Sequence, residues 1–369
     1  MRRKKDLAAG IPENKHREPI SNTNLLLTIT IFIFFGMYIL AMLVWGGGFL
    51  NPQQFLNVFN NNAYLIVLSC GLTIVMIAGG IDISVGGITV LITMACVVYL
   101  DDHNGTVFGS ILLALGIGSA FGIVQGFLIS YLEIQPFIVT LAGMFFGKGM
   151  TTVVSSSPRT AEQASFVALK QFRIVLQNIG YYGKTGNFIP AKIEVGAVVA
   201  LVVVFIIMAI LKWTRLGRNL YAIGGNHQSA LMLGINVKRT RFYSYLLCGV
   251  LSGIGGYVYL MHTGAGNSTN AAMSEMQAIA SSIIGGTLLT GGVGNVVGTL
   301  FGVLSLKTIS NIVIASGLNE PYWQSITTGL MLCFFIVLQS VILSVREKGE
   351  FKIRLPKWLK MKHKKNETD

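Results

Sequence analysis

Charged residues are scarce in this 369-residue sequence: Asp, Glu, Lys and Arg together make up 12% of it. A soluble domain usually carries about 25% charged residues. Apolar residues make up 52%, and they recur in runs of about 20, which is long enough to cross the ~30 Å hydrocarbon core of a bilayer. The composition therefore excludes a soluble globular protein and predicts an all-α polytopic membrane protein.

Cysteine is also rare, and each of the 4 cysteines lies in an apolar run. The cysteines are Cys70, Cys96, Cys248 and Cys333. We interpret them as small buried apolar residues. The 5 histidines show no metal-ligand spacing. Neither a disulfide framework nor a metal site is predicted.

Basic residues exceed acidic ones by 28 to 15, which gives a net charge of +13. They gather in the N-terminal "MRRKK", in the segment 212–241 and in the tail from Arg346. Short cytoplasmic loops and tails of membrane proteins carry an excess of Lys and Arg. Membrane orientation therefore explains the basicity better than a nucleic-acid partner does.

The apolar runs predict ten membrane spans, at residues 24–45, 63–79, 84–100, 107–131, 136–155, 191–211, 242–261, 276–290, 293–315 and 322–345. If "MRRKK" lies in the cytoplasm, six crossings return Lys212 there and four more return Arg346. Both termini are therefore predicted to be cytoplasmic. The spans at 63–79 and 276–290 are short, and we interpret them as broken helices whose unwound backbone faces a protein cavity.

The spans divide the chain into a cytoplasmic N-terminal tail (1–23), a transmembrane domain (24–345) and a basic cytoplasmic C-terminal tail (346–369). An outer loop, 156–190, contains "SFVALKQFRIVLQ", which predicts a short amphipathic helix at the outer surface. An inner loop, 212–241, has a helix-like core, "HQSALMLG", between basic flanks. This loop either docks a soluble partner or lies among the lipid headgroups, and the sequence leaves both alternatives open.

Two Gly-Gly pairs interrupt apolar runs, in "IAGGIDISVGG" and in "IIGGTLLTGGV". The two stretches share the glycine pair, a hydroxyl residue and a further glycine at matching positions, which indicates an internal repeat. Both pairs are predicted to break their helices. The glycines concerned are Gly79, Gly80, Gly285 and Gly286.

Asp82 follows the first pair and is the only acidic residue in the apolar stretch Val75–Met94. An ionisable residue in a span is costly and usually faces a cavity. In one interpretation, Asp82 or Ser84 caps the next helix by accepting its free backbone N–H groups. In the other, both side chains line a polar pathway. The two interpretations are compatible, because a pathway can be lined where a helix is broken.

Four ordered stretches resemble permeases of ABC importers of the ribose/xylose/galactofuranose type. They are "GGIDISVGG", "IQPFIVTLAGMFFGKGM" in its galactofuranose-branch form, "TRLGRNLYAIGGNHQSALMLGINVKRTRFYSYLLCGVLSGIGG" and "AIASSIIGGTLLTGGVGNVVGTLFGV". The resemblance extends over residues 51–345. It implies the permease subunit of a bacterial inner-membrane importer that moves a monosaccharide, in furanose or pentose form, by alternating access.

The resemblance also implies the partners of this chain. They are a cytoplasmic ABC ATPase that binds ATP and Mg²⁺, an extracytoplasmic sugar-binding protein, and a second copy of the permease or a related one. Relatives that import nucleosides or other small polar solutes keep those substrates open as alternatives. An ion-coupled transporter usually needs several intramembrane carboxylates, and an enzyme needs a reactive group. Neither feature is found in this sequence.

The segment 212–241 can be compared with the ABC-permease coupling motif E-A-A-x-x-x-G. Ala230 and Gly234 match the motif, whereas Gln228 and Ser229 depart from it. The resemblance implies that a short helix here fits a groove of the ATPase. The residues expected to take part are Arg215, Gly217, Arg218, Asn226, Gln228, Ser229, Ala230 and Gly234.

"GMFFGKGM" is not a P-loop, because it is one residue short and Gly149 stands where Ser or Thr would bind Mg²⁺. We therefore expect ATP to be hydrolysed by a partner. Polar side chains within the spans are the candidates for the sugar pathway: Asp82, Ser84, Gln125, Thr140, Gln277 and Thr287. Lys307 lies in an apolar run, where it either snorkels towards the interface or faces the cavity.

Overall fold

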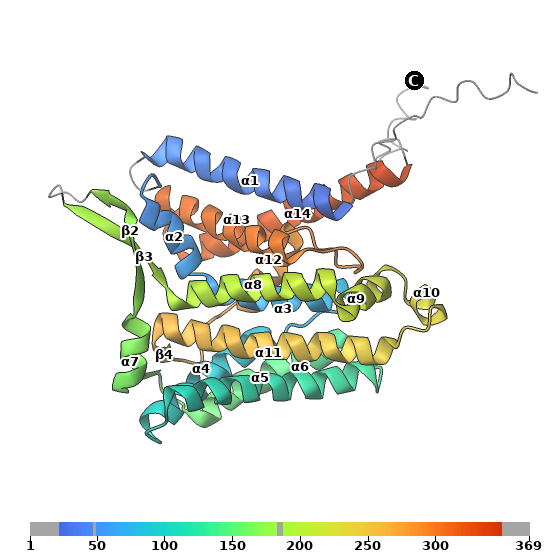
Figure 1. The fold of residues 1–369 in the computed structure, drawn as a ribbon, viewed down its shortest axis with the longest axis horizontal. Coiled ribbons are helices and arrows are strands. Elements are labelled where there is room, and N and C mark those ends of the chain that lie inside the picture. The colour runs from blue at the N-terminus through green and yellow to red at the C-terminus, as the bar shows by residue number, and fades with distance from the viewer. Residues whose placement is uncertain (1–21, 47–48, 183–186, 349–369) are drawn as a thin grey trace, which may run out of the picture.

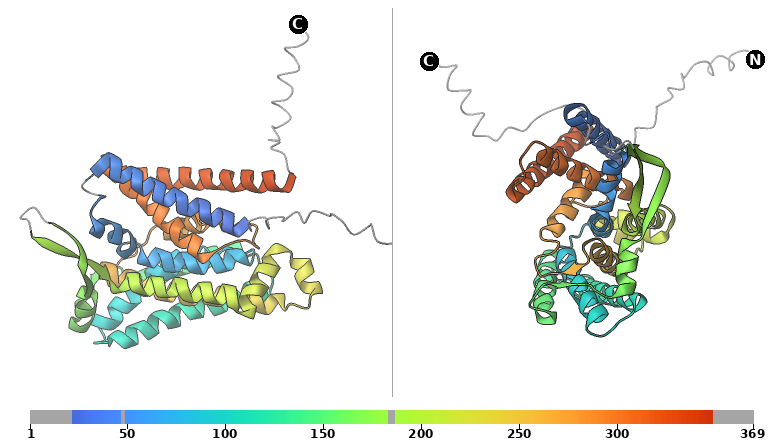
Figure 2. Two further views of the ribbon diagram at one scale, coloured as in Figure 1. Left: turned by 45° about the horizontal axis from the view of Figure 1, so that its top comes forward. Right: turned by 90° about the vertical axis from the view of Figure 1, so that its left-hand side faces the viewer.

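The computed structural model describes residues 22–46, 49–182 and 187–348. The predicted tails, 1–23 and 346–369, lie almost entirely outside these residues, so the structure does not test them. The long helices run along one axis of the molecule (Figure 1), and most of them appear nearly end-on in the perpendicular view (Figure 2). A β-hairpin lies at one end of this bundle, and the short helices α9 and α10 lie at the other (Figure 1).

The first half of the described chain contains α1 (Asn22–Trp45), α2 (Pro52–Asn60), α3 (Ala63–Ile77), α4 (Val85–Asp101), α5 (Val107–Ser130), α6 (Pro136–Val154), β1 (Arg159–Thr160), α7 (Ala164–Gln171) and β2 (Arg173–Tyr182). The second half contains β3 (Phe188–Glu194), α8 (Val195–Trp213), α9 (Arg215–Gly225), α10 (His227–Met232), α11 (Val237–Thr263), β4 (Ala265–Gly266), α12 (Ser274–Ile284), α13 (Val296–Ala315) and α14 (Pro321–Lys348).

Each of the ten predicted spans coincides with one of these helices. Among the described residues, seven helices are long and apolar enough to cross a membrane, and the bent pair α2–α3 would make an eighth. Two helices at the remaining predicted spans are shorter, since α4 has 17 residues and α12 has 11. The structure confirms a polytopic, mostly helical membrane protein, while ten complete crossings stay a prediction.

The predicted helix breaks are found where the Gly-Gly pairs lie. Helix α3 ends at Ile77 and α4 begins at Val85, while α12 ends at Ile284 and α13 begins at Val296. One glycine of each pair has a positive φ, +78° at Gly79 and +90° at Gly286. An L-residue with a side chain is strained in that conformation, so glycine lets each chain turn out of its helix.

The prediction for the outer loop is wrong for its second half. Of "SFVALKQFRIVLQ", only residues up to Gln171 are helical, and Arg173–Tyr182 forms strand β2, which pairs antiparallel with β3. The β-branched and aromatic residues of β2 favour a strand. Its pairing partner, β3, begins only at Phe188, so a local helical pattern could not reveal the pairing. The fold is therefore helical with two small sheets, β2–β3 and β1–β4.

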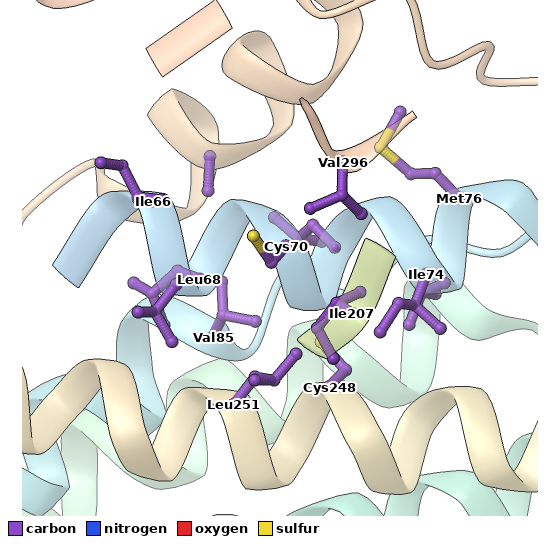
Figure 3. Packing of buried hydrophobic residues seen from close by; sticks show 14 of the residues in the cluster. Ile66, Leu68, Cys70, Ile74, Met76, Val85, Ile207, Cys248, Leu251 and Val296 are labelled. Carbon is purple, nitrogen blue, oxygen red and sulfur yellow. The ribbon is translucent and has the colours of Figure 1, made fainter. Parts of the chain in front are cut away.

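Helix α3 forms the centre of the bundle, and all of its residues except Tyr64 are buried. It packs against α8, α11, α12 and α13. Figure 3 shows this packing around Cys70, Cys248 and Leu251. Three of the cysteines are buried as predicted, but Cys333 is exposed, because it lies on the peripheral helix α14.

The described start of α1 and the end of α14 lie at the same end of the bundle as α9 and α10 (Figure 1). This arrangement agrees with the predicted topology, which places the two tails and the segment 212–241 on one side of the membrane. Which side is the cytoplasm stays a prediction from the basic residues.

Candidate functional site

The inner loop forms two capped helices, α9 and α10. Thr214 accepts a hydrogen bond from the Gly217 backbone N–H through its hydroxyl (3.3 Å), and the Asn226 side chain accepts one from the Ser229 N–H (2.9 Å). Each bond satisfies a backbone donor at a helix start. Helix α10 ends at Met232, and Gly234 follows with a φ of +74°, the left-handed conformation that glycine often adopts just after a helix.

The predicted coupling residues divide into an exposed and a buried group. Gly217 and Ala230 are buried, and Ala230 packs with Ile223 and Val237 to hold α10 on the end of the bundle. The exposed group is Arg215, Arg218, Asn226, Gln228, Ser229 and Gly234.

The sequence analysis did not predict that three exposed apolar residues, here called the apolar tip, lie at the end of α10 beside this exposed group. Leu231, Met232 and Leu233 are 47%, 87% and 78% exposed. The sequence signal that could have revealed them is an apolar run of three residues directly after Ala230, the small residue of the short helix that is buried. Three consecutive exposed apolar residues at a polar end of a membrane protein are typical of a protein contact.

The inner end of α9 touches both helix breaks. A Cβ atom on Gly224 would overlap the carbonyl oxygen of Ile77, where α3 ends, and the backbone nitrogen of Gly292 in the second break. The Gly292 N–H donates to the same Ile77 oxygen (2.9 Å), and the Tyr221 hydroxyl donates to the carbonyl of Gly294 (2.9 Å). Helix α9 therefore contacts both the end of α3 and the segment that leads from α12 into α13.

The structure brings three of the predicted pathway residues together at the first break. Asp82 is 1% exposed, and its Oδ1 accepts hydrogen bonds from the Ser84 N–H (2.9 Å) and the Ser84 hydroxyl (2.6 Å). The Ser84 hydroxyl also lies 3.1 Å from Oε1 of Gln125 on α5.

Only part of the capping interpretation holds. Asp82 pairs one backbone N–H just before α4, whereas the side chain of Ser84 makes no capping bond. The Ser84 hydroxyl is held instead by Asp82, a contact between side chains that the helix pattern does not reveal.

The remaining pathway candidates lie elsewhere. The Thr140 hydroxyl is bonded within its own helix, to the Pro136 carbonyl (2.9 Å). The buried hydroxyl of Thr287 has no hydrogen-bond partner among the described residues. Gln277 accepts a hydrogen bond from Lys307 Nζ (2.6 Å), so Lys307 faces the protein and does not snorkel.

Glu275 is a second buried acidic residue of the bundle, and the sequence analysis did not identify it. Glu275, in the first turn of α12, is 5% exposed and pairs with Lys148 of α6 at 3.3 Å. It escaped the sequence reasoning because it stands one residue before the predicted span 276–290. Its position directly before an apolar run is the sequence signal that could have revealed it.

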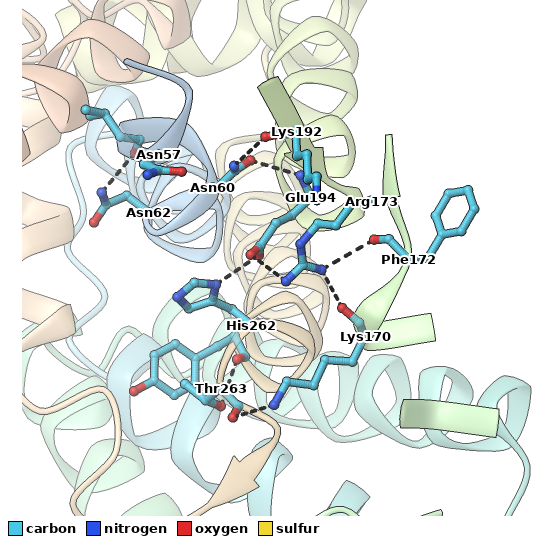
Figure 4. Close-up of polar contacts among 12 residues, drawn as sticks. Asn57, Asn60, Asn62, Lys170, Phe172, Arg173, Lys192, Glu194, His262 and Thr263 are labelled. Atoms are coloured by element: carbon cyan, nitrogen blue, oxygen red, sulfur yellow. Dashed lines mark hydrogen bonds and ion pairs between the residues drawn. The ribbon is translucent and has the colours of Figure 1, made fainter. Parts of the chain in front are cut away.

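A polar network joins the hairpin to the bundle at the opposite end (Figure 4). Glu194, at the end of β3, contacts Arg173 of β2 (2.9 Å) and His262 of α11 (2.9 Å). Asn60 of α2 donates to the Lys192 carbonyl (3.1 Å) and accepts from the Glu194 N–H (3.0 Å). Partial burial raises the pKa of Glu194, but the hydrogen bond from His262 and the nearby positive charges outweigh burial and lower the pKa overall.

Comparison with known proteins identifies relatives along most of the chain. The family described as "Branched-chain amino acid transport system / permease component" matches residues 54–336. The inner membrane ABC transporter permease protein YjfF of Escherichia coli is 34% identical over 318 residues, which cover 86% of this chain and 92% of the relative.

Two further relatives carry names that include a sugar. The fructose import permease protein FruG of Bifidobacterium longum is 34% identical over 320 residues, 85% of this chain and 90% of the relative. The ribose import permease protein RbsC of Bacillus subtilis is 32% identical over 308 residues, 83% of this chain and 91% of the relative. No solved structure shows a significant match.

These relatives confirm the predicted resemblance to ABC-importer permeases of the monosaccharide type. The family match spans the central helix α3, both helix breaks and the segment with α9 and α10. The chain is a membrane transport subunit and belongs to this family of importer permease components.

Proposed function

We propose that this chain is the membrane-spanning permease of an ABC importer for a monosaccharide, taken up in furanose or pentose form across the bacterial inner membrane. The relatives named for fructose and ribose import support a sugar over the amino acids of the family's description, and over a nucleoside or an ion-coupled solute. A second permease copy, or a related permease, completes the pathway.

A cytoplasmic ATPase that holds ATP and Mg²⁺ docks on α9 and α10. The contact of Gly224 with Ile77 and Gly292 carries this part of the proposal, because it joins the docking segment to both breaks without an intermediate side chain. The exposed tip of Leu231, Met232 and Leu233 supplies the apolar part of the docking surface. Arg215 and Arg218 are exposed beside it and are available to acidic groups of the ATPase.

Asp82, Ser84 and Gln125 line the pathway at the first break. All three are buried in this conformation, so the pathway is closed here. Movement of α9 on the Ile77 carbonyl shifts the break and opens the route to these side chains. The sugar-binding protein delivers sugar at the opposite end of the bundle, where the hairpin and α7 lie.

Reconstitution tests the assignment. The purified chain alone should hydrolyse no ATP, whereas proteoliposomes that also contain the cognate ATPase and binding protein should accumulate labelled fructose, ribose or galactose. Met232→Asp should abolish co-purification of the ATPase, because it places a charge in an apolar contact. Tyr182→Asp is the matched control, at a hairpin position that is 75% exposed against 87% for Met232, and should retain the ATPase. ATP hydrolysis by the chain alone, or uptake of leucine instead of sugars, would contradict the proposal.

A further inference from the structure

Two lysines converge on the first turn of α12 from different helices. Lys148 of α6 reaches Glu275 (3.3 Å), and Lys307 of α13 reaches Gln277 (2.6 Å). Lys148 lies 6 residues before the end of α6 and Lys307 lies 8 residues before the end of α13. At 1.5 Å per residue, both lie about 9–12 Å inside the ends of their helices. Both therefore lie at a similar depth, in the half of the bundle towards the hairpin.

The polar atoms of this turn have unused hydrogen-bonding capacity. An ammonium group has three N–H donors. The structure gives the Lys148 and Lys307 ammonium groups one acceptor each. Oε2 of Glu275 and the hydroxyl of Ser274 are buried without a hydrogen-bond partner among the described residues. A buried oxygen without a partner destabilises the protein, and a ligand or water that supplies the missing hydrogen bond removes this penalty.

The packing of Gly86 holds the carboxylate in place. A Cβ atom on Gly86 would overlap Oε2 of Glu275 and would lie 3.1 Å from the Ser274 hydroxyl. Gly86 belongs to the first turn of α4, just after the break that holds Asp82 and Ser84. The same break therefore positions both groups of polar side chains.

The partial exposure of the Lys148 side chain indicates the polarity of the space that this side chain faces. Its side chain is 38% exposed, whereas that of Glu275 is 7% exposed. A partly exposed ammonium within a membrane helix is costly in lipid and usually faces water or protein. The face of α6 that carries Lys148 thus borders a polar space.

We propose that Lys148, Glu275, Gln277 and Lys307 form a subsite for the hydroxyl groups of the entering sugar. The ammonium groups donate to sugar oxygens, and the carboxylate and amide oxygens accept from sugar hydroxyls. A neutral polyol suits this site, because it carries donors and acceptors side by side and brings no charge of its own. This inference rests on the proposed import of a monosaccharide and adds residues at the outer half of its pathway.

The test uses the complete importer in proteoliposomes, with Cys333→Ser as the parent because Cys333 is the exposed cysteine among the described residues. Lys148→Cys is compared with Phe146→Cys, which is 60% exposed on the opposite face of the same helix. A charged, membrane-impermeant methanethiosulfonate should modify Lys148→Cys at least about tenfold faster, since a lipid-facing thiol does not meet the reagent. Equal rates would overturn the proposal. Uptake of fructose, ribose or galactose by the parent would still support the import function in that case.

The second arm tests sugar binding. The transported sugar, delivered by its binding protein, should slow modification of Lys148→Cys, whereas a monodeoxy analogue that lacks the bound hydroxyl should slow it less. Glu275→Gln should lower uptake of the sugar by about tenfold, the effect of losing a hydrogen bond to a charged group. Asp102→Asn, which breaks an exposed ion pair with Arg159 at the same end, is the control and should not change uptake. Absence of sugar protection of Lys148→Cys, or wild-type uptake by Glu275→Gln, would overturn the proposal.

Discussion

Asp82 shows how one side chain serves the backbone and a polar cluster at once. Its Oδ1 accepts from the N–H and the hydroxyl of Ser84, and the residue is 1% exposed. Removing the carboxylate therefore leaves a buried N–H without a partner, whereas an amide in its place keeps the accepting oxygen.

Asp82→Ala should consequently damage the protein more than Asp82→Asn. We expect the alanine variant to lose about 1–3 kcal/mol of stability, the cost of an unsatisfied buried donor. The asparagine variant should keep most of its expression and uptake. Thermal unfolding in detergent and uptake in proteoliposomes measure the difference. Equal loss of uptake in two well-folded variants would show instead that the charge itself is required.

The pKa of Glu194 predicts how the stability of the hairpin end depends on pH. Its pKa in the folded protein lies below the ordinary value of 4.5, because the bond from His262 and nearby positive charges outweigh its partial burial. Since the folded pKa is depressed, its contribution to stability is present above about pH 4.5 and is lost as the pH falls through the folded value.

The melting temperature of the wild type should therefore fall more steeply below pH 4.5 than that of Glu194→Gln, which has no carboxylate to protonate. Calorimetry between about pH 3 and pH 7 checks this expectation. Glu162→Gln, another carboxylate at the hairpin end, serves as the comparison. Identical pH profiles for the wild type and Glu194→Gln would contradict the role of this network.

At the scale of elements, α9 contacts the ends of the membrane helices at both helix breaks, and we propose that it couples them to the ATPase. Gly224 contacts the end of α3 and the second break through backbone atoms, and the adjacent Gly225 has open space around it. The two neighbouring glycines therefore make a matched pair of positions.

Gly224→Ala should lower uptake per ATP hydrolysed, because the added methyl group forces α9 away from Ile77 and Gly292 at a cost of about 1–3 kcal/mol. Gly225→Ala should behave as the wild type. Both variants should still co-purify with the ATPase, because neither glycine lies in the apolar tip. Coupled uptake that is unchanged in Gly224→Ala would argue against α9 as the link.

At the scale of the whole molecule, the bundle has two chemically distinct ends. One carries the hairpin, α7 and the network around Glu194, and the other carries α9, α10 and the described ends of α1 and α14 (Figure 1). The basic residues of the segment 212–241 predict that the second end faces the cytoplasm.

Labelling from the two sides tests this orientation in the Cys333→Ser background. An impermeant maleimide should label Ser229→Cys in inside-out vesicles and Tyr182→Cys in right-side-out cells, since both positions are exposed. The reversed pattern would place α9 and α10 outside, where a cytoplasmic ATPase could not reach them.

The fold class was largely predictable from the sequence, because a bilayer imposes its requirements locally. Every segment that crosses it must be apolar and must satisfy its own backbone hydrogen bonds. Apolar length alone therefore located the ten long segments, and Gly79 and Gly286 marked the points where two of them break. The short helix α10 and the left-handed Gly234 after it were predictable as well, because a helix and the glycine that follows it are local features.

Contacts between distant parts of the chain were decided only by the tertiary structure. The β2 segment became a strand because β3 pairs with it. Glu275 became a buried residue because α4 and α6 close over it, and Gly224 must be glycine because Ile77 and Gly292 lie against it. None of these partners stands within a few residues of the group it contacts. Periodicity and spacing report on neighbours along the chain, whereas burial, ion pairing and close backbone approach depend on which helices the fold brings side by side.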